Sequence, residues 1–127
     1  MATELRWGIL GAAKFAREHM GPAIHMAPNN RLAALATSDA AKAEPFSAID
    51  SRLQVFDDYE ALISSDAIDA VYIPLPNSMH VEWATKAAKA GKHVLCEKPI
   101  AMQASEIDDL IQIREATGVL IAEAYMI

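Results

Sequence analysis

Several residue types are scarce in this chain of 127 residues, and each scarcity excludes a class of protein. The single cysteine, Cys96, cannot form an internal disulfide, nor a zinc site by itself. No apolar run approaches the roughly 18 residues that a membrane-spanning helix needs. The charged start, MATELR, does not resemble a signal peptide. We therefore expect a cytoplasmic protein with no membrane partner and no bound metal.

Basic residues are also few, with 11 Lys and Arg against 17 Asp and Glu, a net charge of −6. They form no cluster, so the sequence has no electrostatic feature that would bind nucleic acid. Hydrophobic residues make up 53% of the chain, enough for a sizeable core. At this length we expect one domain, residues 1–127, with no internal boundary.

Short apolar runs alternate with helical segments along the chain. The runs lack strict polar alternation, which is typical of strands buried on both faces of a parallel sheet. We expect strands at 5–10, 32–36, 53–56, 70–73, 94–96 and 119–124, and helices at 14–26, 40–49, 58–63, 78–90 and 104–117. This order predicts an α/β fold, a doubly wound parallel sheet with helices on both faces.

The ends of the helices carry their own signals. Asp57 and Asn77 are expected to cap helix starts, and Gly91 and Gly118 suit the left-handed residue that ends a helix. Gly21-Pro22 is expected to kink the first helix or divide it in two, because proline removes an amide donor.

The turn after the first strand partly matches the glycine pattern of dinucleotide-binding sites. Gly11 occupies the first glycine position, Ala13 the second and Ala16 the third. Alanine still lets a pyrophosphate approach the backbone, and the following helix start favours an anion. A tight turn that serves packing alone explains the residues equally well.

The second strand lacks the acid that usually grips the ribose of NAD. Thr37 and Ser38 follow this strand, and Lys42 lies one helical turn further on. These residues tolerate a 2′-phosphate, which favours NADP over NAD, whereas Asp39 would repel that phosphate if it turned inward. Capping of the next helix explains Ser38 and Asp39 as well.

Two later turns contain further candidates. Pro74 and Pro76 fix an extended bend after the strand at 70–73, and His80 either lines a cleft there or packs against the strand end. Glu97 and Lys98 end a central strand. Charged groups there cost free energy unless they form an ion pair or take part in function. A solvated ion pair is the plainer alternative. Cys96 is interpreted as core filler.

Three motifs together resemble the Gfo/Idh/MocA family, named after glucose-fructose oxidoreductase and inositol dehydrogenase. They are GILGAAK at 8–14, PLPNSMH at 74–80 and Glu97-Lys98-Pro99. The similarity runs from about residue 5 to residue 126 and is greatest to the dihydrodiol and xylose dehydrogenase branch. It implies a Rossmann fold and an NADP or NAD cofactor.

The resemblance also implies a role for each candidate residue. The pyrophosphate would lie on Gly11, Ala12, Ala13, Lys14 and Phe15, and the adenine ribose on Thr37 and Ser38. Pro74, Leu75, Asn77 and His80 would line the cofactor, and Glu97 and Lys98 would face the nicotinamide and the substrate. Many members carry Arg where Ser38 stands, which leaves the choice of cofactor open. The Lys98–Pro99 peptide is often cis in the family.

The family's chemistry is hydride transfer between NAD(P) and a sugar or diol. Lys98 would hold the substrate oxygen and relay a proton, while Glu97 orients the ammonium or contacts the cofactor. The family's second, substrate-binding domain is not in the sequence, so we expect the cofactor domain of a longer enzyme that is inactive alone. The surface around Tyr125, Met126 and Ile127 is expected to drive homo-oligomer formation.

Two other functions use the same sheet. A nucleotide-sensing module without catalysis would explain the missing substrate domain, but it has no need for Glu97 and Lys98 beside the nicotinamide. A methyltransferase wants an acid at the end of the second strand, and residues 36–38 supply none.

Overall fold

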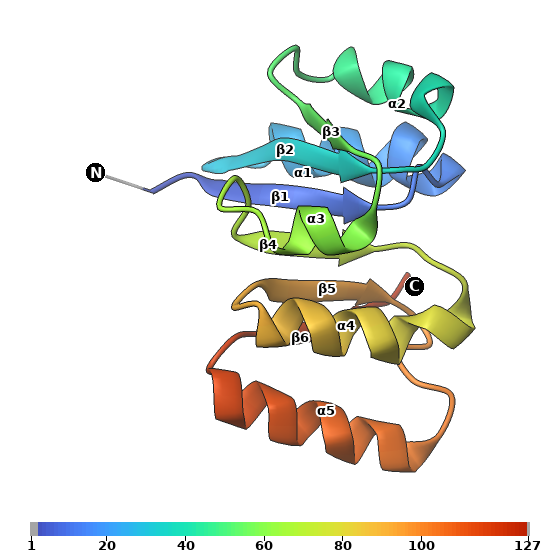
Figure 1. Cartoon of the computed structure of the whole chain (residues 1–127), viewed down its shortest axis with the longest axis vertical. Coiled ribbons are helices and arrows are strands. Elements are labelled where there is room, and N and C mark those ends of the chain that lie inside the picture. Colours follow the sequence, from blue (N-terminus) through green and yellow to red (C-terminus); the bar gives the residue numbers. More distant parts are fainter. Residues whose placement is uncertain (1–2, 127) are drawn as a thin grey trace.

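The computed structural model describes residues 3–126 and contains one six-stranded parallel sheet (Figure 1). The strand order is β3-β2-β1-β4-β5-β6, so it reverses between β1 and β4. The strands are β1 (Leu5–Leu10), β2 (Asn30–Ala36), β3 (Gln54–Phe56), β4 (Ala70–Ile73), β5 (His93–Glu97) and β6 (Ile121–Ala124). The predicted doubly wound fold is confirmed.

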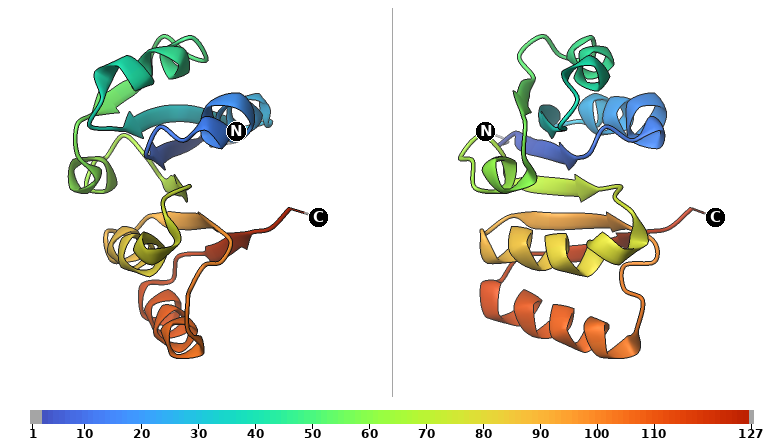
Figure 2. Two further views of the ribbon diagram at one scale, coloured as in Figure 1. Left: turned by 90° about the vertical axis from the view of Figure 1, so that its right-hand side faces the viewer. Right: turned by 45° about the vertical axis from the view of Figure 1, so that its right-hand side comes forward.

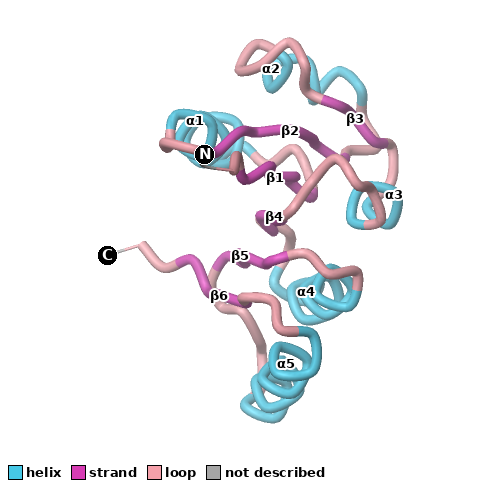
Figure 3. The backbone as a smooth tube through the Cα atoms, turned by 90° about the vertical axis from the view of Figure 1, so that its left-hand side faces the viewer, coloured by secondary structure: helices cyan, strands magenta, loops and turns pink. Residues whose placement is uncertain are grey.

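Helices lie on both faces of the sheet, but they cover the two faces unequally. They are α1 (Gly21–Met26), α2 (Ala40–Ser47), α3 (Tyr59–Ile63), α4 (His80–Lys89) and α5 (Ala104–Thr117). Helices α3, α4 and α5 line one face, and α1 lies on the other beside β1 and β2 (Figures 2 and 3). Within the described residues, no helix covers β5 and β6 on the α1 side (Figure 3), where side chains from β1, β4, β5 and β6 line a shallow apolar hollow. None of the helices within residues 3–126 is both long and apolar enough to cross a bilayer.

Two apolar cores flank the sheet. The larger one includes Leu62, Val71, Ala84 and Leu110, which join α3, α4 and α5 to the strands. The smaller one joins Ile24 of α1 and Phe46 of α2 to Leu32 and Tyr72 of the sheet, among others. Gly8 lets α3 approach β1, since a Cβ there would lie 2.7 Å from Leu62 Cδ2.

The helix after β1 changes its hydrogen-bonding pattern rather than breaking. Ala16–Met20 forms a π-helical turn that continues into α1 at Gly21. The amide of Gly21 donates to the carbonyl of Ala16, five residues earlier. Pro22 has no amide to donate, and the wider turn accommodates it. The expected disruption at Gly21-Pro22 is therefore a change of helix type within one continuous segment.

The two predicted helix-start caps are wrong. Asp58, one residue after Asp57, caps α3 by accepting from the amide of Ala61 at 2.7 Å. Asn77 caps nothing, because the chain enters α4 through a 3₁₀ turn, Asn77–Met79, that has no side-chain cap. The helix ends are confirmed, with Gly91 and Gly118 at φ of 84° and 77°.

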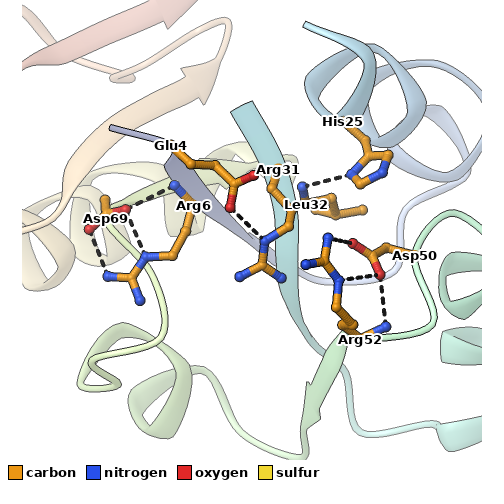
Figure 4. A network of polar contacts seen from close by, with 8 residues as sticks. All are labelled: Glu4, Arg6, His25, Arg31, Leu32, Asp50, Arg52 and Asp69. Carbon is orange, nitrogen blue, oxygen red and sulfur yellow. Dashed lines mark hydrogen bonds and ion pairs between the residues drawn. The ribbon is translucent and has the colours of Figure 1, made fainter. Parts of the chain in front are cut away.

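Ion pairs brace the amino-terminal edge of the sheet (Figure 4). Arg6 of β1 makes a two-pronged pair with Asp69, which precedes β4, at 2.9 and 3.0 Å. Asp50 accepts from both the amide and the guanidinium of Arg52 in the loop before β3. These contacts lie at the strand starts, and the predicted site lies at the opposite edge.

Asp50→Asn is expected to flatten the acid sensitivity of folding. Hydrogen bonds from Arg52 lower the pKa of the buried Asp50 from 3.8 to about 2. The lowered pKa stabilises the fold above about pH 4. That stabilisation, at most about 2.5 kcal/mol, is lost as the pH falls toward 2. Urea unfolding at pH 7, 4 and 2 should show a gap between wild type and Asp50→Asn that closes with falling pH. The exposed Asp57→Asn is the control, and an unchanged gap would contradict the assignment.

Candidate functional site

The predicted site residues gather at the carboxyl edge of the sheet, around the reversal of strand order between β1 and β4. Parallel strands end at one edge, so the turns after β1, β2, β4 and β5 meet there. A hollow of about 220 Å³ lies among the turns after β1, β4 and β5. Its lining residues are Ala13, Phe15, Tyr72, Pro74, Leu75, Asn77, His80, Glu97, Lys98 and Met126. All but Tyr72 and Met126 were predicted site residues; their roles stay predictions.

The turn after β1 keeps its backbone exposed to a ligand. Gly11 has φ of 94°, and its amide donates to the carbonyl of Ala36 at 2.8 Å. A Cβ at Gly11 would lie 3.2 Å from Leu75 Cδ2 and 3.5 Å from the Tyr59 hydroxyl. Within residues 3–126, the amides of Ala12 and Ala13 have no hydrogen-bond acceptor. Two free amide donors therefore lie beside Gly11, where any side chain would block a ligand from the turn.

The turn after β2 uses some of its predicted residues internally. Thr37 is buried, and its hydroxyl oxygen accepts from the amide of Asp39 at 3.2 Å. The Asp39 carboxylate accepts from the amide of Ala41 at the start of α2. Ser38 and Lys42 are exposed. Asp39 is therefore engaged as a helix cap, which leaves Ser38 and Lys42 as the side chains free to meet a ligand.

A second hollow, of about 400 Å³, lies beyond the ends of β2 and β3. Only one of its lining residues, Ser38, was a predicted site residue. Its other lining residues are Asp57, Asp58, Tyr59, Glu60 and Trp83. The rings of Tyr59 and Trp83 meet edge to face with centroids 5.2 Å apart. The available signal was two of the chain's few aromatic residues in helices that begin at the carboxyl edge of the sheet.

His80 joins the turns after β4 and β5. It is 1% exposed, with Nδ1 2.7 Å from the carbonyl oxygen of Pro99 and Nε2 2.7 Å from that of Leu75. Both partners are backbone carbonyl oxygens, so the ring links the turn after β4 to the turn after β5. His80 therefore both lines the hollow and packs against the strand end, which were the two alternatives for this residue.

The carboxylate of Glu97 does not pair with Lys98. It accepts a hydrogen bond from the hydroxyl of Tyr72, and no ion pair joins Glu97 to Lys98 in the described part of the chain. Both residues nevertheless line the same hollow. The solvated ion pair, which was the plainer alternative, is therefore not formed within the described residues. The two roles considered for Glu97, orienting the Lys98 ammonium or contacting the cofactor, stay predictions. The Lys98 side chain is exposed, and the Lys98–Pro99 peptide is cis, as expected.

Cys96, the residue before Glu97, is fully buried. Burial and the charges of Glu97 and Glu123 raise the pKa of its thiol to about 12, so it remains a protonated core residue, as predicted. Residues 3–126 contain no group of three or more His, Cys, Asp or Glu side chains that could hold a metal ion.

Comparisons of the sequence with known proteins point to oxidoreductases. A family described as "Oxidoreductase family, NAD-binding Rossmann fold" matches residues 5–125. D-xylose 1-dehydrogenase (NADP(+)) 2 of Haloferax volcanii is 41% identical over 125 residues, which cover 96% of this chain and 37% of that protein. A dTDP-3,4-didehydro-2,6-dideoxy-alpha-D-glucose 3-reductase of Saccharopolyspora spinosa is 40% identical over 126 residues, 99% of this chain and 38% of that one.

Solved structures agree with the sequence comparisons. The 3-ketoreductase KijD10 from Actinomadura kijaniata, in complex with NADP and TDP-benzene, superposes with a TM-score of 0.89 at 33% identity. The superposition covers 95% of this chain and 37% of the ketoreductase. The chain thus spans somewhat more than a third of the length of the proteins it matches.

Proposed function

This chain belongs to the oxidoreductase family with an NAD-binding Rossmann fold, and from that premise we propose that it binds NADP in preference to NAD across the carboxyl edge of its sheet. The observation that carries the proposal is the position of the Gly11 turn between the two hollows. Ala13 and Phe15 line the smaller hollow, and the hydroxyl of Tyr59, which lines the larger one, lies beside Gly11. A dinucleotide has this layout, with a pyrophosphate between two nucleoside ends.

The residues of the central turn fit a pyrophosphate. The free amides of Ala12 and Ala13 supply donors, and the helical segment that follows presents its positive end. The bare Gly11 leaves room that a Cβ would take. Lys14 is exposed at the same turn and adds a positive charge.

The larger hollow suits the adenosine end. Tyr59 and Trp83 offer aromatic surface, and Ser38 places a hydroxyl at the rim. Ser38 and Lys42 would meet a 2′-phosphate, while the amide of Ala41 holds the Asp39 carboxylate at the start of α2. NADP in the related ketoreductase structure supports the same choice.

The smaller hollow suits the nicotinamide end, lined by Pro74, Leu75, Asn77, His80, Glu97 and Lys98. When bound, the nicotinamide would accept or donate a hydride. Lys98 is the group for the substrate, since its exposed ammonium makes no ion pair in the described chain and would hold a carbinol oxygen and relay its proton. His80 keeps the two turns that carry these residues together.

We propose that the complete protein is a longer oxidoreductase that interconverts a sugar or diol and its oxidised form, with residues 1–127 as its cofactor-binding domain. The related proteins are named for xylose and for a dTDP-sugar, and the match takes up 37–38% of their length. The exposed Tyr125 and Met126 support association with further protein surface, including a second copy of the chain. Ile127 lies outside the described residues.

Calorimetric titration of the chain with NADP(H) and NAD(H) tests the function. We expect weak binding of both and a preference for NADP of about tenfold, the effect of one added ionic contact of about 1.4 kcal/mol. Lys42→Ala should reduce that preference, and the matched control Lys89→Ala, at the far end of α4, should not. Absence of heat with either cofactor at millimolar concentration would refute the function. Equal affinities would refute the preference.

A further inference from the structure

Tyr72 is a buried polar residue with no assigned role in the site. It is the third residue of β4, at the centre of the sheet, and its side chain is fully buried against the core on the α1 side. Tyr72 also lines the smaller hollow. A buried hydroxyl needs a partner, and this one donates to Oε2 of Glu97 at the end of the neighbouring strand.

The contact fixes the position of the Glu97 carboxylate. Glu97 is half-buried, and Tyr72 is the only residue within the described chain with which its side chain hydrogen-bonds. Burial and the charge of Glu97 raise the pKa of Tyr72, so the phenol keeps its proton and remains the donor. The negative charge therefore stays on Glu97, and a rigid strand sets its location.

We propose that Tyr72 is a positioning residue that holds the Glu97 carboxylate against the nicotinamide end of the cofactor, so that the pocket favours the oxidised ring. The proposal rests on the proposed function. The oxidised nicotinamide ring carries a positive charge and the reduced ring is neutral, so a carboxylate close to the ring stabilises the oxidised form more.

The positively charged Lys98 ammonium lines the same hollow and acts against Glu97. Its side chain is exposed, so solvent screening weakens its effect. The contribution of Glu97 is therefore measured as a change in the ratio of the NADP⁺ and NADPH dissociation constants between variants. The absolute ratio in the wild-type chain does not report it. In the absence of its partner, the flexible Glu97 side chain is free to turn toward Lys98 and away from the ring.

The test measures the dissociation constants of NADP⁺ and NADPH for the 127-residue chain. Glu97→Gln removes the charge and should shift the ratio of the two constants toward NADPH by about fivefold or more. Tyr72→Phe, which loses only the hydroxyl, should shift the ratio in the same direction by a smaller factor. Glu97→Asp keeps the charge but shortens the side chain away from Tyr72, and it should behave like Tyr72→Phe. The double variant Tyr72→Phe/Glu97→Gln should show no larger shift than Glu97→Gln alone, because Tyr72 acts through Glu97.

The ratio separates positioning from a general structural role. Loss of core packing would weaken both forms equally, so an unchanged ratio in Tyr72→Phe and Glu97→Asp would overturn the proposal. Should Tyr72→Phe fail to fold, Glu97→Asp decides alone. Lys89→Ala, an exposed residue at the end of α4, is the control and should leave the ratio unchanged. Failure of the wild-type chain to bind either form would instead refute the proposed function, and the two failures are thus distinguishable.

Discussion

Gly11→Val is expected to reduce the affinity for NADP(H) by at least a hundredfold while the chain remains folded. Gly11 has φ of 94°, where a β-branched residue is strained, and the new Cβ would lie 3.2 Å from Leu75 Cδ2. The valine methyl groups would also occupy the space in which a pyrophosphate meets the amides of Ala12 and Ala13. Calorimetry measures the affinity, and circular dichroism with urea unfolding reports the fold.

Gly91→Val is the matched control for backbone strain. Gly91 has φ of 84°, close to that of Gly11, but a Cβ there meets nothing within 4 Å. Both variants should lose about 1–2 kcal/mol of unfolding free energy from the left-handed conformation. Only Gly11→Val should lose binding. Equal loss of binding in both variants, or unfolding of Gly11→Val alone, would make Gly11 a structural glycine.

The 127-residue chain is expected to show no measurable sugar or diol dehydrogenase activity, whereas the longer protein that we propose should turn over. Hydride transfer needs the substrate held about 3 to 3.5 Å from the nicotinamide in aligned geometry. The hollow at Glu97 and Lys98 is small and open to water, and the Lys98 side chain is exposed. A single wall cannot hold a polar sugar in place against exchange with water.

Lys98→Ala in the longer protein should lower kcat by about 10²- to 10⁴-fold, the usual contribution of a positioned proton-transfer group. The absorbance of the reduced cofactor, followed with a panel of aldoses and diols, measures turnover. Lys89→Ala is the matched control, because Lys89 is an exposed lysine at the end of α4 that is farther from His80. Turnover by the 127-residue chain, or full activity of Lys98→Ala, would contradict this account of the site.

Local patterns in the sequence predict most of the fold. The helix at 104–117 is predicted with both ends correct. Its last residue is predictable because Gly118 supplies the left-handed residue that ends the helix. Strands β2 and β5 extend beyond their predicted limits at polar residues such as Asn30 and His93. Backbone pairing with neighbouring strands includes these residues, and hydropathy within one segment does not report it.

The site is predictable where it consists of turns and not where it depends on contacts between strands. Residues after β1, β4 and β5 follow from the rule that ligands bind at the carboxyl edge of a parallel sheet. The bond from Tyr72 to Glu97 spans two strands, and no pattern near residue 72 indicates that its hydroxyl reaches the end of β5. The hollow around Tyr59 and Trp83 likewise joins α3 to α4, which are separated in the sequence by β4.

The reversal of strand order also divides the sheet into two halves. Each half of the sheet is continuous in sequence, and the pairing of β1 with β4, from Trp7 with Ala70 to Ile9 with Tyr72, joins the halves. During synthesis the first half emerges with the Gly11 turn, and the second half brings Lys98 later. In the site that we propose, a dinucleotide would contact both halves and so hold this junction together. The resistance of the β1–β4 amides to hydrogen exchange should therefore rise with cofactor concentration.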